Sequence, residues 1–211
     1  MGPFEIVKDL EDALCEFTNS PFCVTVNSCT NALGICLEYA KKDMHLDAIE
    51  PISIPTHTYI GVPMQIKRAG FDIVFNKVNW WGAYELSPLN IWDSARRFEH
   101  DLFNSIIKPS ANYKYICLSF HISKILGFDQ GGAILHNNPD FDVYARKMRF
   151  DGRTEGISAK RDYPDVLGRH CYMSPTTAAG LLWKLSYFDY TQPTILPNSD
   201  YPDLSQMDIF K

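Results

Sequence analysis

The feature that most constrains the fold is an alternation of short apolar runs with longer stretches that have helical spacing. Residues 22–26, FCVTV, have the pattern of a buried strand, and the apolar residues of ALGICLEYAKK then repeat with the period of a helix. The same alternation continues along the chain, with strands expected at 50–55, 71–75, 89–93, 113–120 and 132–136 and helices at 4–17, 58–69, 140–150 and 176–188. Strands that alternate with helices predict an α/β domain with a largely parallel sheet.

Length and composition agree with one folded domain. The chain has 211 residues, of which 45% are hydrophobic, and its formal net charge is −5. This supply of apolar side chains is enough for a buried core and excludes a disordered chain. The acidic balance argues against nucleic acid or an anionic membrane as the main partner. We expect residues 1–190 to form the domain and residues 191–211, rich in Pro, Ser and Asp, to form an extended tail.

The N-terminal segment and the cysteines indicate a reduced, cytoplasmic setting. MGPFEIVKDLEDAL is acidic and amphipathic, unlike a signal peptide, and no apolar run reaches the ~18 residues of a membrane span. The six cysteines form no C-x-x-C pair, and no His lies at a zinc-like spacing from them. We therefore expect a cytoplasmic protein without a metal site.

Three segments carry groups that suit chemistry at the carboxyl edge of a sheet. Asn27–Asn31 lies between a strand and a helix, where backbone N–H groups and hydroxyls can bind an anion. Asp93 ends a predicted strand, and Lys124 follows another strand on a short loop. Taken singly, each feature also has a plainer interpretation: a helix cap for the first two and a solvent-facing side chain for the lysine.

Six segments are similar, in the correct order, to the motifs of one known family. VTVNSCTNALGICL resembles V-x-S-G-T-x-A-L, and ISIPTHTYIGVPMQIKRAG resembles P-x-x-T-F/W/Y-x-A…G. IWDSARRF is similar to E-D-A-A-Q, and LSFHISKILGFDQGGAIL is similar to S-F-x-x-x-K…G-E-G-G-A. RKMRFDG and GRHCYMSPTTAAGLLWKL resemble two later segments, so the resemblance covers about residues 4–188. The family is that of the DegT/DnrJ/StrS sugar aminotransferases.

This resemblance implies a fold, a cofactor and a reaction. The fold is the large domain of the aspartate aminotransferase superfamily, a three-layer α/β sandwich with a mostly parallel sheet, and the cofactor is pyridoxal phosphate (PLP). The implied reaction transfers an amino group, usually from glutamate, to a nucleotide-linked keto sugar in a homodimer. We expect a shortened member, because residues 76–88 are too few for the family's strand–helix unit and the C-terminal small domain is absent.

The resemblance also assigns roles at the ring of the cofactor. Lys124 would hold the aldehyde as a Schiff base, and Asp93 would pair with the pyridinium nitrogen. Tyr59 would stack on the ring face. Arg96 stands where the family has a glutamine that contacts the ring hydroxyl, and a cation there would favour the ionised hydroxyl.

The same carry-over places the cofactor's phosphate at the first strand–helix turn. The residues implied there are Ser28, Cys29, Thr30 and Ser119. The family has glycine at the position of Cys29, so the backbone here must approach the phosphate without glycine's freedom.

Two other interpretations of the chain stay open. One is a non-catalytic relative that acts as a binding or assembly subunit, which the missing strand–helix unit and Arg96 favour. Retention of Lys124, Asp93 and Tyr59 favours the enzyme instead. The other is a PLP-dependent sugar dehydratase, which is disfavoured because that branch replaces the family's lysine with histidine.

Overall fold

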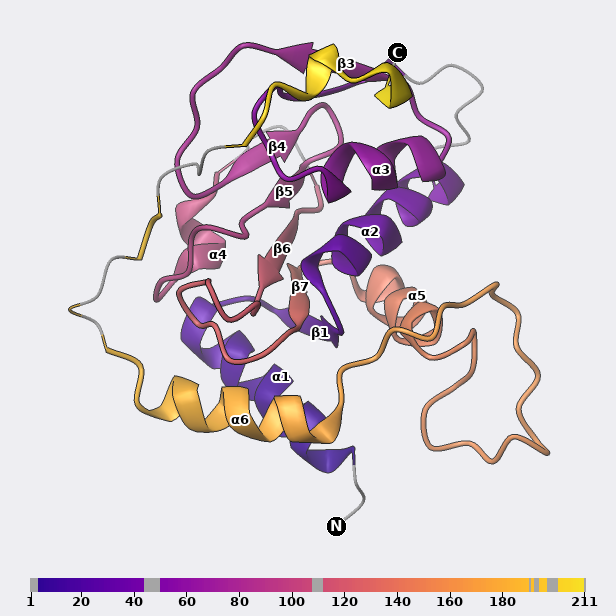
Figure 1. The fold of residues 1–211 in the computed structure, drawn as a ribbon. Coiled ribbons are helices and arrows are strands. Elements are labelled where there is room, and N and C mark those ends of the chain that lie inside the picture. The colour runs from indigo at the N-terminus through magenta and orange to yellow at the C-terminus, as the bar shows by residue number, and fades with distance from the viewer. Residues whose placement is uncertain are drawn as a thin grey trace.

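The fold is built on a five-stranded sheet and a two-stranded sheet (Figure 1). The computed structural model describes residues 4–43, 50–107, 112–189, 191, 194–196 and 201–210. In spatial order, the larger sheet contains β1 (Phe22–Val26), β7 (Gly132–His136), β6 (Tyr115–Ser119), β5 (Ile91–Asp93) and β4 (Tyr84–Leu86). The smaller sheet pairs β2 (Ile52–Pro55) with β3 (Ile73–Asn76).

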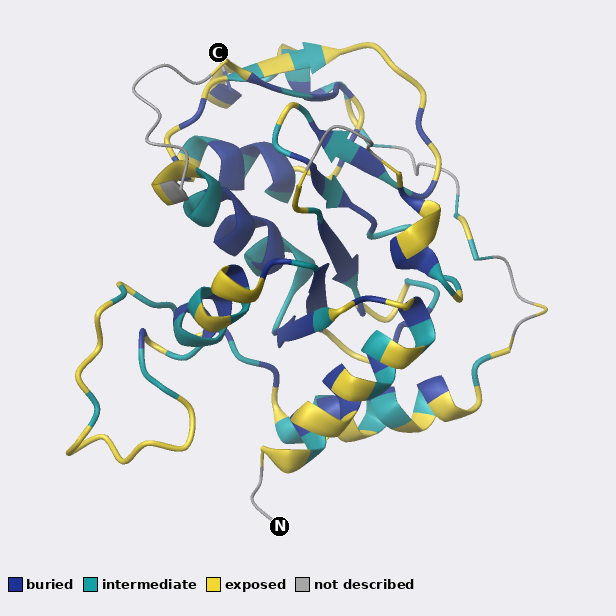
Figure 2. Ribbon diagram, turned by 180° about the vertical axis from the view of Figure 1, so that it is seen from behind, coloured by how far each residue is buried: buried dark blue, intermediate teal, exposed yellow. Residues whose placement is uncertain are grey.

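Helices cover both faces of the larger sheet. On one face lie α2 (Cys29–Asp43), α3 (Gly61–Arg68) and α5 (Pro139–Arg149), and on the other lie α1 (Glu5–Thr18), α4 (Leu102–Ser105) and α6 (Pro175–Ser186). Alternate strand residues divide between the two cores: Val24 packs with the first group and Cys23 with the second. Figure 2 shows the central strands as buried and one side of α1 and α6 as exposed. Among the described helices, none has the length and apolar character needed to span a bilayer.

The larger sheet is mixed, so the expectation of a mostly parallel sheet is wrong. β1 and β6 are each antiparallel to β7, β4 is antiparallel to β5, and only β5 and β6 pair in parallel. The connections explain these directions. Residues 120–131 join β6 to β7 and residues 87–90 join β4 to β5, and neither connection contains the crossover helix that parallel neighbours require.

Most strands nevertheless point the same way. Because β1 and β6 are both antiparallel to β7, they are parallel to each other and to β5. A bridge between Ser53 and Ser87 sets β2 antiparallel to the extension of β4, so β2 and β3 share the direction of β5. The carboxyl ends of β1, β2, β5 and β6 therefore face the same edge, which is where α/β proteins bind ligands.

Two segments differ from their sequence-based descriptions. Residues 76–88, where no strand or helix was expected, contain β4. The described parts of 191–211 pack against the domain instead of extending from it: Leu196 N–H donates to the Arg96 carbonyl (2.8 Å), and Leu204 N–H donates to the Thr56 carbonyl (2.9 Å). Leu204 begins a short 3₁₀ helix and is fully buried, so one apolar side chain anchors a segment whose composition is mostly polar.

Candidate active site

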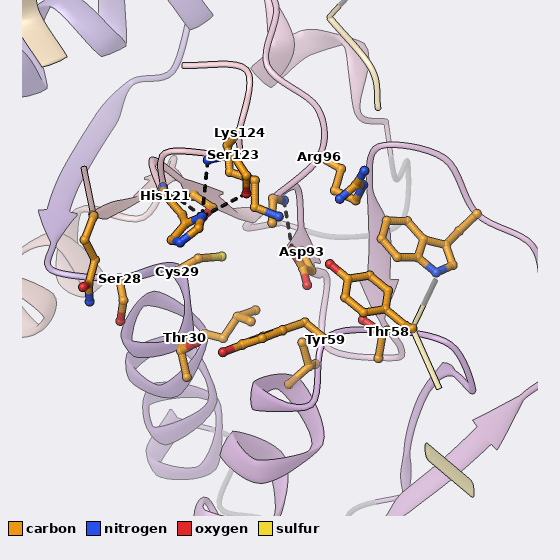
Figure 3. Close-up of a pocket in the computed structure, with 18 residues that line it drawn as sticks. Ser28, Cys29, Thr30, Thr58, Tyr59, Asp93, Arg96, His121, Ser123 and Lys124 are labelled. Carbon is orange, nitrogen blue, oxygen red and sulfur yellow. Dashed lines mark hydrogen bonds between the residues drawn. The ribbon is translucent and has the colours of Figure 1, made fainter. Parts of the chain in front are cut away.

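A pocket of about 760 Å³ lies at this edge of the sheet (Figure 3). Its lining includes every residue expected to bind the cofactor: Ser28, Cys29, Thr30, Tyr59, Asp93, Arg96, Ser119 and Lys124. These residues come from the start of α2, the turn before α3, the end of β5 and the segment after it, the end of β6, and the loop before β7. The volume is that of a small-molecule site.

The start of α2 forms one end of the pocket. The helical hydrogen bonds begin with Ala32 N–H donating to the Ser28 carbonyl (3.0 Å), so the N–H groups of Cys29 and Thr30 have no acceptor within the helix. β7 approaches this turn so closely that a Cβ on Gly132 would lie 2.5 Å from the Cys29 nitrogen. Cys29 itself has helical backbone, so this position does not require glycine. Free amides, hydroxyls and the helix dipole make this end suited to a phosphate.

Asp93 places a carboxylate on the floor of the pocket. The residue is 5% exposed, and its Oδ1 accepts from Ala95 N–H at 2.9 Å while its Oδ2 accepts from the Tyr84 hydroxyl at 3.1 Å. Burial raises the pKa of Asp93 above its ordinary value, although both hydrogen bonds and the positive charge of Lys124 oppose that rise. A cationic ligand group beside this carboxylate would offset the cost of its burial.

Lys124 is held at the pocket by two tight turns. Its N–H donates to the His121 carbonyl (2.8 Å), and its carbonyl accepts from Gly127 N–H (2.9 Å). A Cβ on Gly127 would lie within 2.7 Å of three carbonyl oxygens, so the turn requires glycine. In the view of Figure 3, Lys124 lies above Asp93 and Tyr59 lies below it. The lysine is half-buried and lines the pocket together with Asp93.

Tyr59 and Cys29 complete the surroundings of Asp93. Tyr59 is 53% exposed and its ring packs over Gly61, where a Cβ would lie 2.7 Å from a ring carbon. This leaves a ring face on the open side of the pocket. Burial, followed by the charge of Asp93, raises the pKa of the Cys29 thiol well above its ordinary value. Cys29 therefore contributes its backbone and a neutral thiol.

The site residues predicted from the sequence do not include several residues in and around the pocket. Trp80 lines it and donates from Nε1 to the His57 carbonyl (2.9 Å), and Tyr201 lines it with its carbonyl 2.9 Å from His57 Nδ1. The apolar alternation of YEL is compatible with a strand at β4, but it does not predict that Tyr84 lies opposite Asp93. No local signal could have placed Tyr201, because its position depends on the docking of Leu204.

Solved structures share this fold. The chain matches the sugar aminotransferase CalS13 from Micromonospora echinospora with a TM-score of 0.63 at 16% identity, covering 86% of this chain and 61% of that one. PseC from Helicobacter pylori, an aminotransferase involved in the biosynthesis of pseudoaminic acid, matches with a TM-score of 0.62 at 15% identity, covering 86% and 58%. A DegT DnrJ EryC1 StrS aminotransferase from Brucella abortus matches with a TM-score of 0.63 at 19% identity, covering 89% of this chain and 59% of that one. The fold is that of sugar aminotransferases, over about three fifths of their length.

The chain belongs to the DegT/DnrJ/EryC1/StrS aminotransferase family. The family model matches residues 2–90 and 110–194. A comparison with curated proteins gave no match. The family match leaves out residues 91–109, which include Asp93 and Arg96, so the assignment of these two residues depends on their geometry in the pocket.

Proposed function

We propose that the chain uses PLP to transfer an amino group from glutamate to a nucleotide-linked keto sugar. The observation that carries the proposal is the convergence of one anion-binding turn, one buried carboxylate and one lysine on a single pocket. Family membership supports the reaction class, because residues that are far apart in the sequence retain the family's order of motifs. The sugar nucleotide and glutamate are inferred from the family resemblance alone.

The groups of the pocket fit PLP from end to end. The amides of Cys29 and Thr30 and the hydroxyls of Ser28 and Ser119 would bind its phosphate. Asp93 would pair with its ring nitrogen, because a buried carboxylate is stabilised by a cation. When bound, PLP supplies an electron sink for the carbon that carries the amino group.

Lys124 would carry out the two functions that need an amine. Its Nζ would bind the cofactor's aldehyde, and once released it would move a proton between the substrate carbon and the cofactor. Anchoring of the phosphate at α2 fixes the distance over which that amine has to act. Tyr59 would cover one ring face and limit the access of water from the open side.

Borohydride reduction with peptide mapping tests the proposal. We expect PLP to give an absorption band with the wild-type protein and, after reduction, a pyridoxyl label on the peptide that contains Lys124. Lys124→Ala should lose the label, whereas Lys160→Ala, which changes an exposed lysine, should keep it. A folded wild-type protein that takes no label in excess PLP would refute the proposal and favour a non-catalytic binding or assembly subunit.

We also propose that the chain forms a homodimer in the cytoplasm. Exposed apolar residues adjoin the pocket lining: Ile60 follows Tyr59, and Ile122 lies between His121 and Ser123. Association of two copies would bury such surface. Sedimentation with PLP at micromolar concentration should show a dimer, and a monomer under those conditions would contradict this expectation.

A further inference from the structure

A chain of hydrogen bonds lies behind the carboxylate of Asp93. Asp93 Oδ2 accepts from the Tyr84 hydroxyl (3.1 Å), and that hydroxyl lies 2.6 Å from Thr58 Oγ1. Tyr84 is 7% exposed and Thr58 is 1% exposed, so water does not replace these contacts easily. All three polar groups are therefore satisfied by one another.

The chemistry of these groups fixes the direction of the protons. An ionised carboxylate only accepts, so the Tyr84 hydroxyl must donate to Asp93. The tyrosine oxygen is then available as an acceptor, and Thr58 can donate to it. Both bonds are satisfied when Asp93 is charged, and hydrogen bonds to a charged group are stronger than those between neutral groups.

Tyr84 reaches Asp93 because β4 pairs with β5. The antiparallel register sets Tyr84 directly opposite Asp93, and Trp80 packs edge-on against the Tyr84 ring at 4.8 Å between centroids. β4 belongs to the segment that is too short for the family's strand–helix unit. The short segment thus supplies the Tyr84 hydroxyl as a donor to the carboxylate, and Tyr84 is not among the predicted site residues.

We propose that Tyr84 is a positioning residue that, with Thr58 behind it, orients the carboxylate of Asp93 and favours its charged form. This inference rests on the proposed function only for the identity of the cation that would pair with Asp93, the ring nitrogen of PLP. The remaining groups around Asp93 act differently. Lys124, on the loop before β7, favours the charged carboxylate, whereas burial disfavours it, and Cys29 on α2 and Cys117 on β6 are thiols whose own pKa values are raised well above the ordinary range.

The test follows the titration of Asp93 in protein without PLP. Aspartate labelled with ¹³C at Cγ gives a carboxyl signal that moves on protonation, and Asp93→Asn identifies the signal of Asp93. In Tyr84→Phe, we expect the midpoint of that signal to rise by about one pH unit, because a donor to the charged form is lost. Thr58→Val should move it in the same direction by a smaller amount.

Tyr115→Phe is the matched control. It also removes a buried tyrosine hydroxyl, one that accepts from Asn138 Nδ2 at 2.9 Å, and it should leave the Asp93 midpoint in place. An Asp93 midpoint in Tyr84→Phe that is unchanged or lower would overturn the proposal. If Tyr84→Phe does not fold, Thr58→Val decides the question by the same criterion.

Labelling with PLP separates this inference from the proposed function. A shifted midpoint in protein whose Lys124 takes no pyridoxyl label would support the role of Tyr84 and refute the aminotransferase. A labelled Lys124 with an unshifted midpoint would support the aminotransferase and refute the role of Tyr84.

Discussion

Glu11 on α1 is the residue whose replacement should test the packing of the domain most directly. It is 3% exposed, and its Oε1 accepts from both the N–H and the hydroxyl of Thr25, each at 2.8 Å, and from Arg149. Its Oε2 accepts from Arg146 at 2.7 Å. This network fixes β1 one residue before its end, close to the turn at Ser28.

Glu11→Gln keeps the shape of the side chain and removes the charge. Two hydrogen bonds to guanidinium groups, each worth roughly 1.5–3 kcal/mol, are weakened or lost. Arg149 retains Glu155 and the Thr25 carbonyl, and Arg146 retains Asp142, so neither cation is left alone. We therefore expect a loss at the lower end of the range for broken buried pairs, about 3 kcal/mol.

Urea unfolding followed by near-UV circular dichroism measures this loss. With a slope of about 2 kcal/mol/M, the midpoint should fall by about 1.5 M. Glu16→Gln, an exposed change on the same helix, should alter stability by less than about 0.5 kcal/mol. A loss below about 1 kcal/mol for Glu11→Gln would refute the argument that these charges stabilise the fold.

The pH dependence of stability provides a second measurement. Burial would raise the pKa of Glu11, but Arg149 and Arg146 outweigh it and hold the pKa below the ordinary value of 4.5. A lowered pKa in the folded state means that the stabilisation is present above pH 4.5 and is lost as the pH falls through the folded value. Glu11→Gln should lack this part of the acid dependence, and an acid profile that matches the wild type would contradict the assignment.

Three further changes test the pocket. If Asp93 pairs with the ring nitrogen as proposed, Asp93→Asn should keep some PLP but lose amino transfer in single-turnover assays, because the charge is gone. Normal half-reaction rates would refute that pairing. Gly132→Ala places a Cβ 2.5 Å from the Cys29 nitrogen, so the turn proposed to bind the phosphate should shift. We expect the affinity for PLP to fall about tenfold and the free energy of unfolding to fall by about 1–3 kcal/mol, and an unchanged affinity in a fluorescence titration would refute this. Leu204→Ala removes about 2–5 kcal/mol of packing and should release the segment around Tyr201 to limited proteolysis, whereas an unaltered cleavage pattern would show that the segment docks by other contacts.

Periodicity predicted where most of the elements lie, but not β4 or α4 and not how the strands are directed. The run at 22–26 is β1 to the residue, and the helical spacing of Val7, Leu10 and Leu14 gives the buried face of α1. A buried strand can have the same apolar sequence pattern whether its neighbour is parallel or antiparallel. Direction depends on the connections, and the segment between β6 and β7 has no helical pattern that would allow a crossover.

The pocket was predictable where residues follow strands that share a direction. Asp93 ends such a strand and Lys124 follows another, and the structure brings both to the same edge. Tyr84 and Tyr201 were not predictable in this way. Tyr84 is placed by its register opposite Asp93, and Tyr201 by the bond from Leu204 N–H to the Thr56 carbonyl. Both depend on pairing between segments that local spacing does not encode.

Because β7 lies between β6 and β1, we expect it to pair with β6 first and with β1 later. β6 and β7 are close in the chain and can pair early, whereas the register Phe22–His136 requires closure of a long loop, at an entropic cost. The turn at Ser28 follows β1, and Lys124 lies between β6 and β7, so we expect the two halves of the pocket to meet only in that later step. A ligand that bridges both halves binds the native state and not its precursor, and it should therefore slow unfolding while leaving the folding rate unchanged.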